Sequence, residues 1–209
     1  MDRLNQWLRR VPTAVVWGLG ALPFCWLIAQ AATNQLGPDP VKAIELSLGL
    51  WGLQFLIASL AITPIRILGI NLLKFRRALG VYAFLYVMVH FLAWMILDMG
   101  LRLDEVLRDL TRRPYIIVGM IGLLAMFPLA LTSTNAAIRY LGGARWRSLH
   151  RLAYLAGLAG SVHFVLLVKG WQAEPLIYAL TLLCLLLLRL PRVKIGLRAR
   201  GKSRAPQRV

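Results

Sequence analysis

The sequence predicts an all-α integral membrane protein, a bundle of six transmembrane helices with both termini in the cytoplasm. Its 209 residues are 59% hydrophobic and 16% charged, with a mean hydropathy of +0.66. Six apolar runs approach the ~20 residues that a helix needs to cross a hydrocarbon core. Basic residues are concentrated in every second connection between these runs, and this bias predicts how the chain is oriented in the membrane. The predicted spans are 11–31, 44–63, 79–97, 115–132, 149–168 and 175–190.

The first run, 11–31, follows Arg9 and Arg10 and contains Ala29-Gln30-Ala31, which is similar to a signal-peptidase site. We expect this run to be retained as a span, because it is longer than the apolar core of a typical signal peptide. The charge distribution described below also requires it.

Prolines mark the ends of the later runs. Pro64 is expected to end the second span, and Pro191 the sixth. Pro114 and Pro175 are expected at helix starts, where a missing N–H costs nothing. Pro128 lies inside the fourth run and predicts a kink there.

The connection 101–110 places apolar residues at helical spacing among charged ones. This pattern predicts an amphipathic helix that lies at the membrane interface. A docking surface for a soluble partner is the alternative interpretation. The apolar positions are Leu103, Val106, Leu107 and Leu110.

The charge is strongly basic, with 25 Lys and Arg against 8 Asp and Glu and a net charge of +17. Such a balance usually indicates nucleic acid or anionic lipid as a partner. Here the basic residues flank apolar runs and do not alternate with exposed aromatic residues. We therefore expect contacts with membrane lipids and no nucleic-acid partner.

The distribution of charge predicts the orientation. With the N-terminus in the cytoplasm, 19 of the basic residues and only one acid, Asp2, lie on the cytoplasmic side. The chain then divides into a cytoplasmic N-tail (1–10), a transmembrane domain (11–190) and a basic cytoplasmic C-tail (191–209). The cytoplasmic basic residues are Arg3, Arg9, Arg10, Arg66, Lys74, Arg76, Arg77, Arg139, Arg145, Arg147, Arg151, Arg189, Arg192, Lys194, Arg198, Arg200, Lys202, Arg204 and Arg208.

Three histidines lie in or beside the spans, and an ionisable residue at membrane depth is a candidate functional residue. His90 is eight residues before Asp98 and His163 is six before Lys169, so the two rings lie within about 3 Å of one depth. Two imidazoles from separate helices can bind the opposite faces of a haem iron. Depth alone leaves a bis-histidine haem and hydrogen-bonded structural histidines as equal alternatives.

The third histidine, His150, lies about 20 Å below His163 and roughly 140° away from its helix face. The residue 13 positions before His90 is Arg77 and not a histidine. His150 is therefore a weaker candidate for a metal ligand, with a contact to a cofactor edge or a lipid headgroup as alternatives. Three arginines could pair with haem propionates or a flavin phosphate. They are Arg77, Arg147 and Arg151.

Two blocks of sequence carry a resemblance to a known family. The first is Lys74-Phe75-Arg76-Arg77-Ala78-Leu79-Gly80, which leads to His90. The second is 131–169, which contains Leu131-Thr132-Ser133-Thr134-Asn135, Leu149-His150-Arg151 and His163. Through these motifs the sequence resembles the haem-binding membrane subunits of periplasmic methionine sulfoxide reductase systems, the MsrQ family, within the ferric-reductase-like transmembrane group.

The resemblance implies a multi-pass protein of the bacterial inner membrane that binds haem b and FMN. It implies an electron-transfer subunit, with electrons passing from a cytoplasmic flavin reductase or the quinone pool to a periplasmic molybdenum-containing catalytic subunit that repairs oxidised methionine. The matching histidines are His90, His150 and His163, with the first and last as the axial pair. The wider group pairs histidines at both depths, whereas this sequence has Arg77 at one of those positions.

Two other classes of function stay open. One is a stand-alone ferric reductase or a quinol-oxidising cytochrome b. The other is a transporter whose histidines relay protons or bind a metal ion. A transporter predicts acidic partners within the spans, whereas Glu45 lies only at a span edge, and no internal repeat is visible in the sequence.

Overall fold

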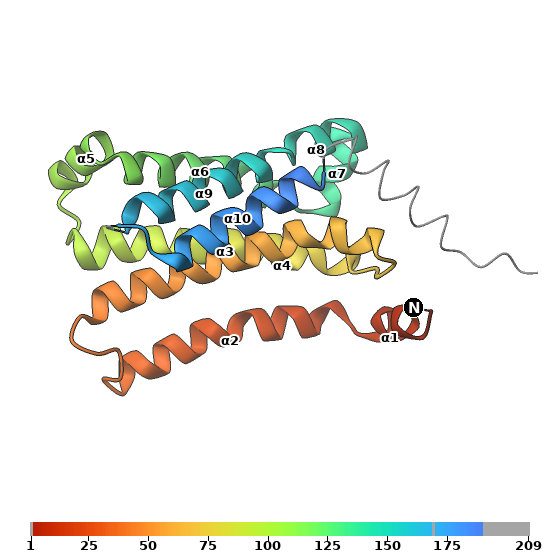
Figure 1. Ribbon diagram of the computed structural model, residues 1–209, viewed down its shortest axis with the longest axis horizontal. Coiled ribbons are helices and arrows are strands. Elements are labelled where there is room, and N and C mark those ends of the chain that lie inside the picture. Colours follow the sequence, from red (N-terminus) through yellow and green to blue (C-terminus); the bar gives the residue numbers. More distant parts are fainter. Residues whose placement is uncertain (1, 169, 190–209) are drawn as a thin grey trace, which may run out of the picture.

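The computed structural model describes residues 2–168 and 170–189, and helices make up most of this part of the chain (Figure 1). No strand occurs among these residues. The helices are α1 (Asp2–Arg10), α2 (Thr13–Ala32), α3 (Pro40–Ile67), η1 (Leu73–Phe75), α4 (Arg76–Ala93), the π-helical turn η2 (Trp94–Asp98), α5 (Leu103–Arg112), α6 (Pro114–Leu131), α7 (Asn135–Leu141), α8 (Gly143–Leu149), α9 (Leu152–Leu167) and α10 (Ala173–Leu187).

Five helical segments are long and apolar enough to cross a membrane, so the chain is a multi-pass membrane protein. The last apolar helix, α10, has 15 residues, fewer than the ~20 that a perpendicular span needs. The sixth predicted span, 175–190, therefore stays a prediction, and its last residue lies outside the described part. The five segments are Thr13–Ala32, Pro40–Ile67, Leu73–Asp98, Pro114–Leu131 and Gly143–Leu167.

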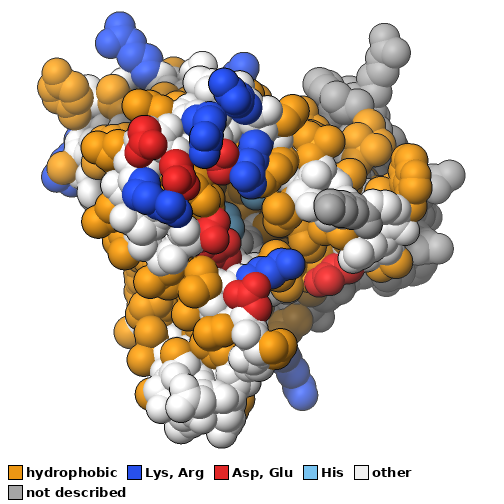
Figure 2. Space-filling model, turned by 90° about the vertical axis from the view of Figure 1, so that its left-hand side faces the viewer, with side chains coloured by type: hydrophobic (Ala, Val, Ile, Leu, Met, Phe, Trp, Pro, Cys, Tyr) orange, Lys and Arg blue, Asp and Glu red, His pale blue; other side chains and the backbone are white. Residues whose placement is uncertain are grey.

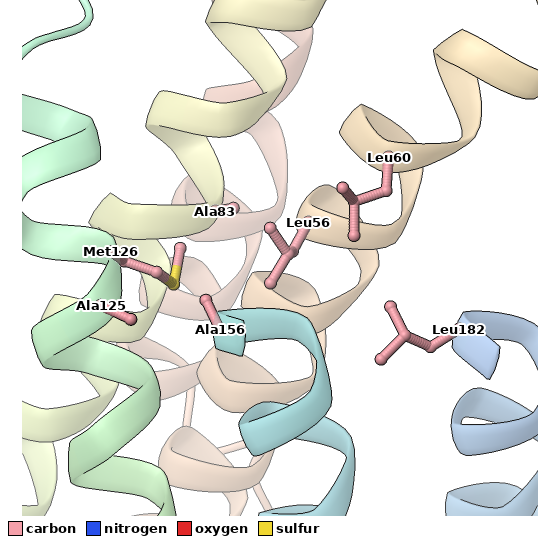
Figure 3. Close-up of a cluster of buried hydrophobic side chains, with 7 residues drawn as sticks. All are labelled: Leu56, Leu60, Ala83, Ala125, Met126, Ala156 and Leu182. Carbon is pink, nitrogen blue, oxygen red and sulfur yellow. The ribbon is translucent and has the colours of Figure 1, made fainter. Parts of the chain in front are cut away.

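Two closely packed helix pairs form the centre of the bundle: α3 with α4, and α6 with α9. The pairs meet where α4 contacts α6 and where α3 contacts α9, and α10 packs along α9 and α3. Helix α2 lies on one flank against α4 and α3 (Figure 1). The interior holds a buried cluster with contributions from five helices (Figure 3). Its members are Leu56, Leu60, Ala83, Ala125, Met126, Ala156 and Leu182.

The prolines behave partly as predicted. Pro114 begins α6, Pro175 lies in the first turn of α10, and Pro128 lies inside α6. The prediction that Pro64 ends the second span is wrong, because α3 continues through it to Ile67. Pro191 lies outside the described residues.

A side chain of another helix makes Pro64 tolerable inside α3. Proline has no N–H, so the carbonyl of Leu60, four residues earlier, loses its helical donor. The guanidinium of Arg189 donates a hydrogen bond to that carbonyl instead.

A second proline inside a helix is Pro23, in α2. The hydroxyl of Tyr86, on α4, accepts a hydrogen bond from the Phe24 amide at 3.0 Å and donates one to the Gly20 carbonyl at 2.8 Å. A side chain inserted in this way into the hydrogen-bond ladder next to a proline is typical of a bent helix. The same hydroxyl ties α2 to the bundle.

The amphipathic helix predicted at 101–110 is present as α5, which packs on α6. Only Val106 of its four apolar positions is buried, while Leu103 and Leu107 are 65% and 63% exposed. A buried acid, Asp109, shares the inner face and pairs with Arg113 at 3.1 Å. The inner face is therefore partly polar.

Charges separate between the two ends of the bundle. The end with α5 and the start of α3 carries acidic and basic side chains side by side, with a small area of histidine surface visible between them (Figure 2). The opposite end, with η1, α7 and α8, is basic in the sequence. The acidic residues of the first end are Asp39, Glu45, Asp98, Asp104, Glu105, Asp109 and Glu174.

Candidate functional site

Two histidines from different helix pairs meet inside the bundle. His90 lies on α4 and His163 on α9, and their ring centroids are 6.2 Å apart with the rings inclined at 77°. Both rings are half-buried. The expectation that these two side chains share a depth is confirmed.

The same type of hydrogen bond orients each ring. His90 Nδ1 lies 2.8 Å from the carbonyl oxygen of Glu45, on α3, and His163 Nδ1 lies 2.6 Å from that of Tyr115, on α6. A carbonyl can only accept, so each Nδ1 carries the hydrogen and each Nε2 keeps its lone pair. Nε2 is then the atom free to bind a metal, with the second-shell hydrogen bond typical of metal-binding histidines.

A glycine lies four residues after each of these carbonyls. A Cβ on Gly49 would come within 3.2 Å of His90 Nδ1, and a Cβ on Gly119 would come within 2.7 Å of His163 Nδ1. The glycines thus let each ring lie directly against the neighbouring helix. The sequence analysis did not predict a role for these glycines. The only signal in the sequence is a similar spacing: each histidine follows the residue whose carbonyl it contacts, by 45 residues for His90 and by 48 for His163.

The separation of the rings fits two axial ligands of one metal. Metal–nitrogen bonds of about 2 Å, plus about 1.1 Å from nitrogen to ring centre, place two such centroids about 6.2 Å apart. The observed value is 6.2 Å. Among the described residues, no group of three or more His, Cys, Asp or Glu side chains could hold a bare ion. Two imidazoles alone suit a metal whose other ligands come from a macrocycle.

His150 lies apart from this pair, at the end of α8. Its Nε2 is 3.1 Å from the hydroxyl oxygen of Thr132, and its ring stacks on Trp146 at 3.8 Å. The indole of Trp146 donates to the Thr132 carbonyl at 2.9 Å. These contacts attach α8 to the end of α6, and the structure brings no second histidine to His150.

The three arginines singled out from the sequence are all exposed at the basic end. Arg77 donates to the side-chain oxygen of Asn135 at 2.8 Å, which connects α4 to α7. Arg147 lies on α8, and Arg151 follows it in the turn before α9. The structure does not bring these side chains to the His90 and His163 rings.

Comparison with known proteins places this arrangement in a family. The family described as ferric reductase like transmembrane component matches residues 45–161. Proteins of Brucella ovis, Brucella canis and Brucella melitensis are each 50% identical over 195 residues, which cover 90% of this chain and 88% of the relative. Each is named protein-methionine-sulfoxide reductase heme-binding subunit MsrQ. The chain belongs to the MsrQ family.

The MsrQ assignment confirms the resemblance drawn from the 74–80 and 131–169 blocks. The matched segment of the ferric-reductase-like family begins at Glu45, the residue whose carbonyl orients His90, and includes both glycines beside the rings. His163 lies two residues beyond its end. The relatives cover that residue's region as well, because their match extends over most of the chain.

Proposed function

We propose that this chain is the haem b subunit of a methionine sulfoxide reductase system and that His90 and His163 are the axial ligands. The observation that carries the proposal is the 6.2 Å pair, with both Nδ1 atoms held by backbone carbonyls. The printed name of the relatives, a heme-binding subunit, supports the same cofactor. Haem supplies reversible one-electron transfer at its iron when bound.

The protein's own contribution is to hold the two imidazoles in one tautomer and one orientation. The Glu45 and Tyr115 carbonyls keep each Nδ1 protonated and make the ring a stronger ligand. Gly49 and Gly119 give the rings space against α3 and α6. Because backbone atoms on rigid helices do this work, the ligands are oriented before the cofactor binds.

The direction of electron transfer follows from the charge distribution. The basic end is predicted to be cytoplasmic. The ring pair lies toward the α5 end, because His90 is near the end of α4 and His163 contacts the carbonyl of Tyr115, in the first turn of α6 directly after α5. Electrons would enter at the basic end from a cytoplasmic flavin reductase or the quinone pool. They would leave at the α5 end to a periplasmic molybdenum-containing catalytic subunit. The chain itself is then an electron-transfer subunit and not the one that reduces oxidised methionine.

The proposal includes FMN at the basic end, with a bacterial inner-membrane location and both termini in the cytoplasm. Arg77, Arg147 and Arg151 are the exposed cations that would contact a flavin phosphate there. Because the Nε2 of His150 already faces the Thr132 hydroxyl, we assign this residue to a contact with a cofactor edge and not to metal binding. Helix α10 would complete the sixth crossing by packing along α9 and α3.

One experiment separates this function from a stand-alone ferric reductase. The purified chain is reduced anaerobically, and its haem absorption is followed after addition of the catalytic subunit and methionine sulfoxide. We expect the haem to be fully reoxidised only when the catalytic subunit and methionine sulfoxide are both present. Equal reoxidation by ferric citrate without the catalytic subunit would favour the stand-alone reductase and contradict the proposal.

A further inference from the structure

The short helix α1, at the basic end of the bundle, is amphipathic. It places Leu4, Trp7 and Leu8 at helical spacing, and Val11 follows one turn after Trp7. Helix α1 does not continue into α2, because Pro12 has an extended backbone (φ −66°, ψ 148°) between them. Figure 1 shows α1 beyond the end of α2. It is therefore a separate element that precedes the first long span.

Polar contacts fix the rotation of α1 about its own axis. The side chain of Asn5 donates a hydrogen bond to the Gly69 carbonyl at 2.7 Å and accepts one from the Asn71 amide at 3.0 Å. The ammonium of Lys74, in η1, donates to the Arg9 carbonyl at 3.0 Å. All three contacts are with the connection between α3 and α4, so the side of α1 that carries Asn5 faces this connection.

The apolar side of α1 faces away from that connection. At 3.6 residues per turn, Trp7 lies about 160° and Leu4 about 100° around the helix from Asn5. The side chains of Trp7 and Leu4 are 62% and 43% exposed. The next large apolar side chains that are exposed along the chain are Val15 and Trp17, in the first two turns of α2. The exposed face of α1 therefore leads directly into the surface that α2 presents to lipid.

Arginines flank this apolar face. Arg3 and Arg10 lie about 40° and 60° from Trp7 around the helix, whereas Arg9 lies about 160° away, on the opposite side. All three arginines are exposed, and Asp2 is the only acid in residues 1–38. A face with tryptophan and leucine beside arginines is typical of a helix in the headgroup region of a membrane, where anionic lipids attract the arginines. The charge and the continuity with α2 favour an anionic lipid surface over a protein partner.

We propose that α1 lies in the surface of the membrane, with Leu4 and Trp7 inserted among the acyl chains and with Arg3 and Arg10 bound to the phosphates of anionic phospholipids. Burial of the apolar side chains and the attraction between guanidinium and phosphate groups both stabilise this position. The contacts of Asn5 hold the helix in the required rotation before lipid binds. The surface is separate from the histidine pair, and the inference does not depend on haem.

The first test locates the two faces of α1 in the full-length protein, in vesicles of phosphatidylcholine and phosphatidylglycerol. The free Cys25 and Cys184 are replaced by alanine, and a nitroxide label is attached to the cysteine of Leu4→Cys or, as the matched control, of Gln6→Cys. Gln6 is also exposed and lies about 160° around the helix from Leu4. Spin relaxation gives the collision rates of each label with oxygen, which concentrates in lipid, and with a water-soluble nickel chelate. We expect the ratio of oxygen to nickel collisions to be several-fold higher for the label at position 4.

The second test asks whether the bound lipid is anionic. The spectrum of the Leu4→Cys label separates lipid-immersed and water-exposed populations of α1. We expect Arg10→Gln to shift the ratio of these populations about fivefold toward water, the effect of one basic residue at an anionic membrane surface. The matched control, Arg9→Gln, removes the same charge from the opposite side of the helix and should shift the ratio by less than about twofold. In vesicles of phosphatidylcholine alone, the two variants should behave alike.

Three results would overturn the proposal. Equal collision ratios at positions 4 and 6 would show that α1 does not lie in the membrane surface. Dipolar broadening between labels at position 4 would show that a second copy of the chain covers the apolar face. Equal shifts in Arg10→Gln and Arg9→Gln with phosphatidylglycerol present would mean a diffuse effect of net charge. Haem absorption and circular dichroism of the same samples should be unaltered, so a failure of the haem assignment is seen separately.

Discussion

Among single residues, Gly119 is the one most closely tied to the geometry of the histidine pair. A methyl group there would lie 2.7 Å from His163 Nδ1, so the ring must shift or the helices must separate. We expect Gly119→Ala to lose most of the bound haem and to destabilise the fold by about 1–3 kcal/mol. Gly49→Ala should have a smaller effect, because its methyl would be 3.2 Å from His90 Nδ1. Haem per protein, measured from absorbance, checks both variants.

The control for these variants is Gly18→Ala, where a Cβ meets nothing within 4 Å. It should keep full haem content. Normal haem in Gly119→Ala would show that the ring does not need this contact with α6.

His150 provides a second prediction at this scale. Its contacts are with Thr132 and Trp146, and it lies far along the helix from His163. We therefore expect His150→Ala to keep most of the haem absorption spectrum. Reduction from the cytoplasmic side, followed by stopped-flow absorbance in inverted vesicles, should become slower. Loss of the main absorption bands would show that His150 is an axial ligand.

Sequence reasoning could predict that His90 and His163 are neighbours, because depth along a helix follows directly from residue counting. It could not identify Glu45 and Tyr115, since both act through backbone carbonyls, which leave no trace in the residue type. It also missed Arg189, whose role depends on a carbonyl released by a proline in another helix. Interactions between a side chain and the main chain of another helix could not be predicted from the sequence.

Among the elements, α2 is held to α4 by two tyrosine hydroxyls: Tyr82 donates to the Trp17 carbonyl, and Tyr86 bonds the backbone beside Pro23. The Tyr86 hydroxyl lies between the Phe24 amide and the Gly20 carbonyl, next to Pro23, and bonds both of them. Tyr86→Phe should destabilise the docking of α2 by about 1–3 kcal/mol, the cost of a buried unpaired polar group. Thermal unfolding in detergent, followed by circular dichroism, measures the loss as a lower Tm. Tyr140→Phe is the control, because Tyr140 is 91% exposed and should leave the Tm unchanged.

The extents of the elements were predictable wherever composition alone decides them. The five long spans and the helix at 103–112 follow from apolar runs and helical spacing. The end of α3 could not be predicted in this way, because a proline normally ends a helix. The contact between Arg189 and the Leu60 carbonyl compensates for Pro64 inside α3. The inner face of α5 also differs from the prediction, since Asp109 is buried there by pairing with Arg113.

For the whole molecule, the central expectation is orientation. The charge separation predicts that the basic end, with α7 and α8, faces the cytoplasm and that the α5 end faces outward. Alkaline phosphatase fused within the loop before α5 should be active, and the same reporter after residue 209 should be inactive. An active fusion at residue 209 would place the C-terminus outside and would contradict the six-span orientation.

The most direct test of the proposed function is the optical absorption spectrum of the purified full-length protein and two variants. The wild type should show a Soret band and sharp α and β bands on reduction, as expected of a bis-histidine haem b. His90→Ala and His163→Ala should each lose these bands, because each removes one of the two rings that lie 6.2 Å apart. A colourless wild-type protein, or either variant with the unaltered spectrum, would contradict the assignment of this pair as the haem ligands.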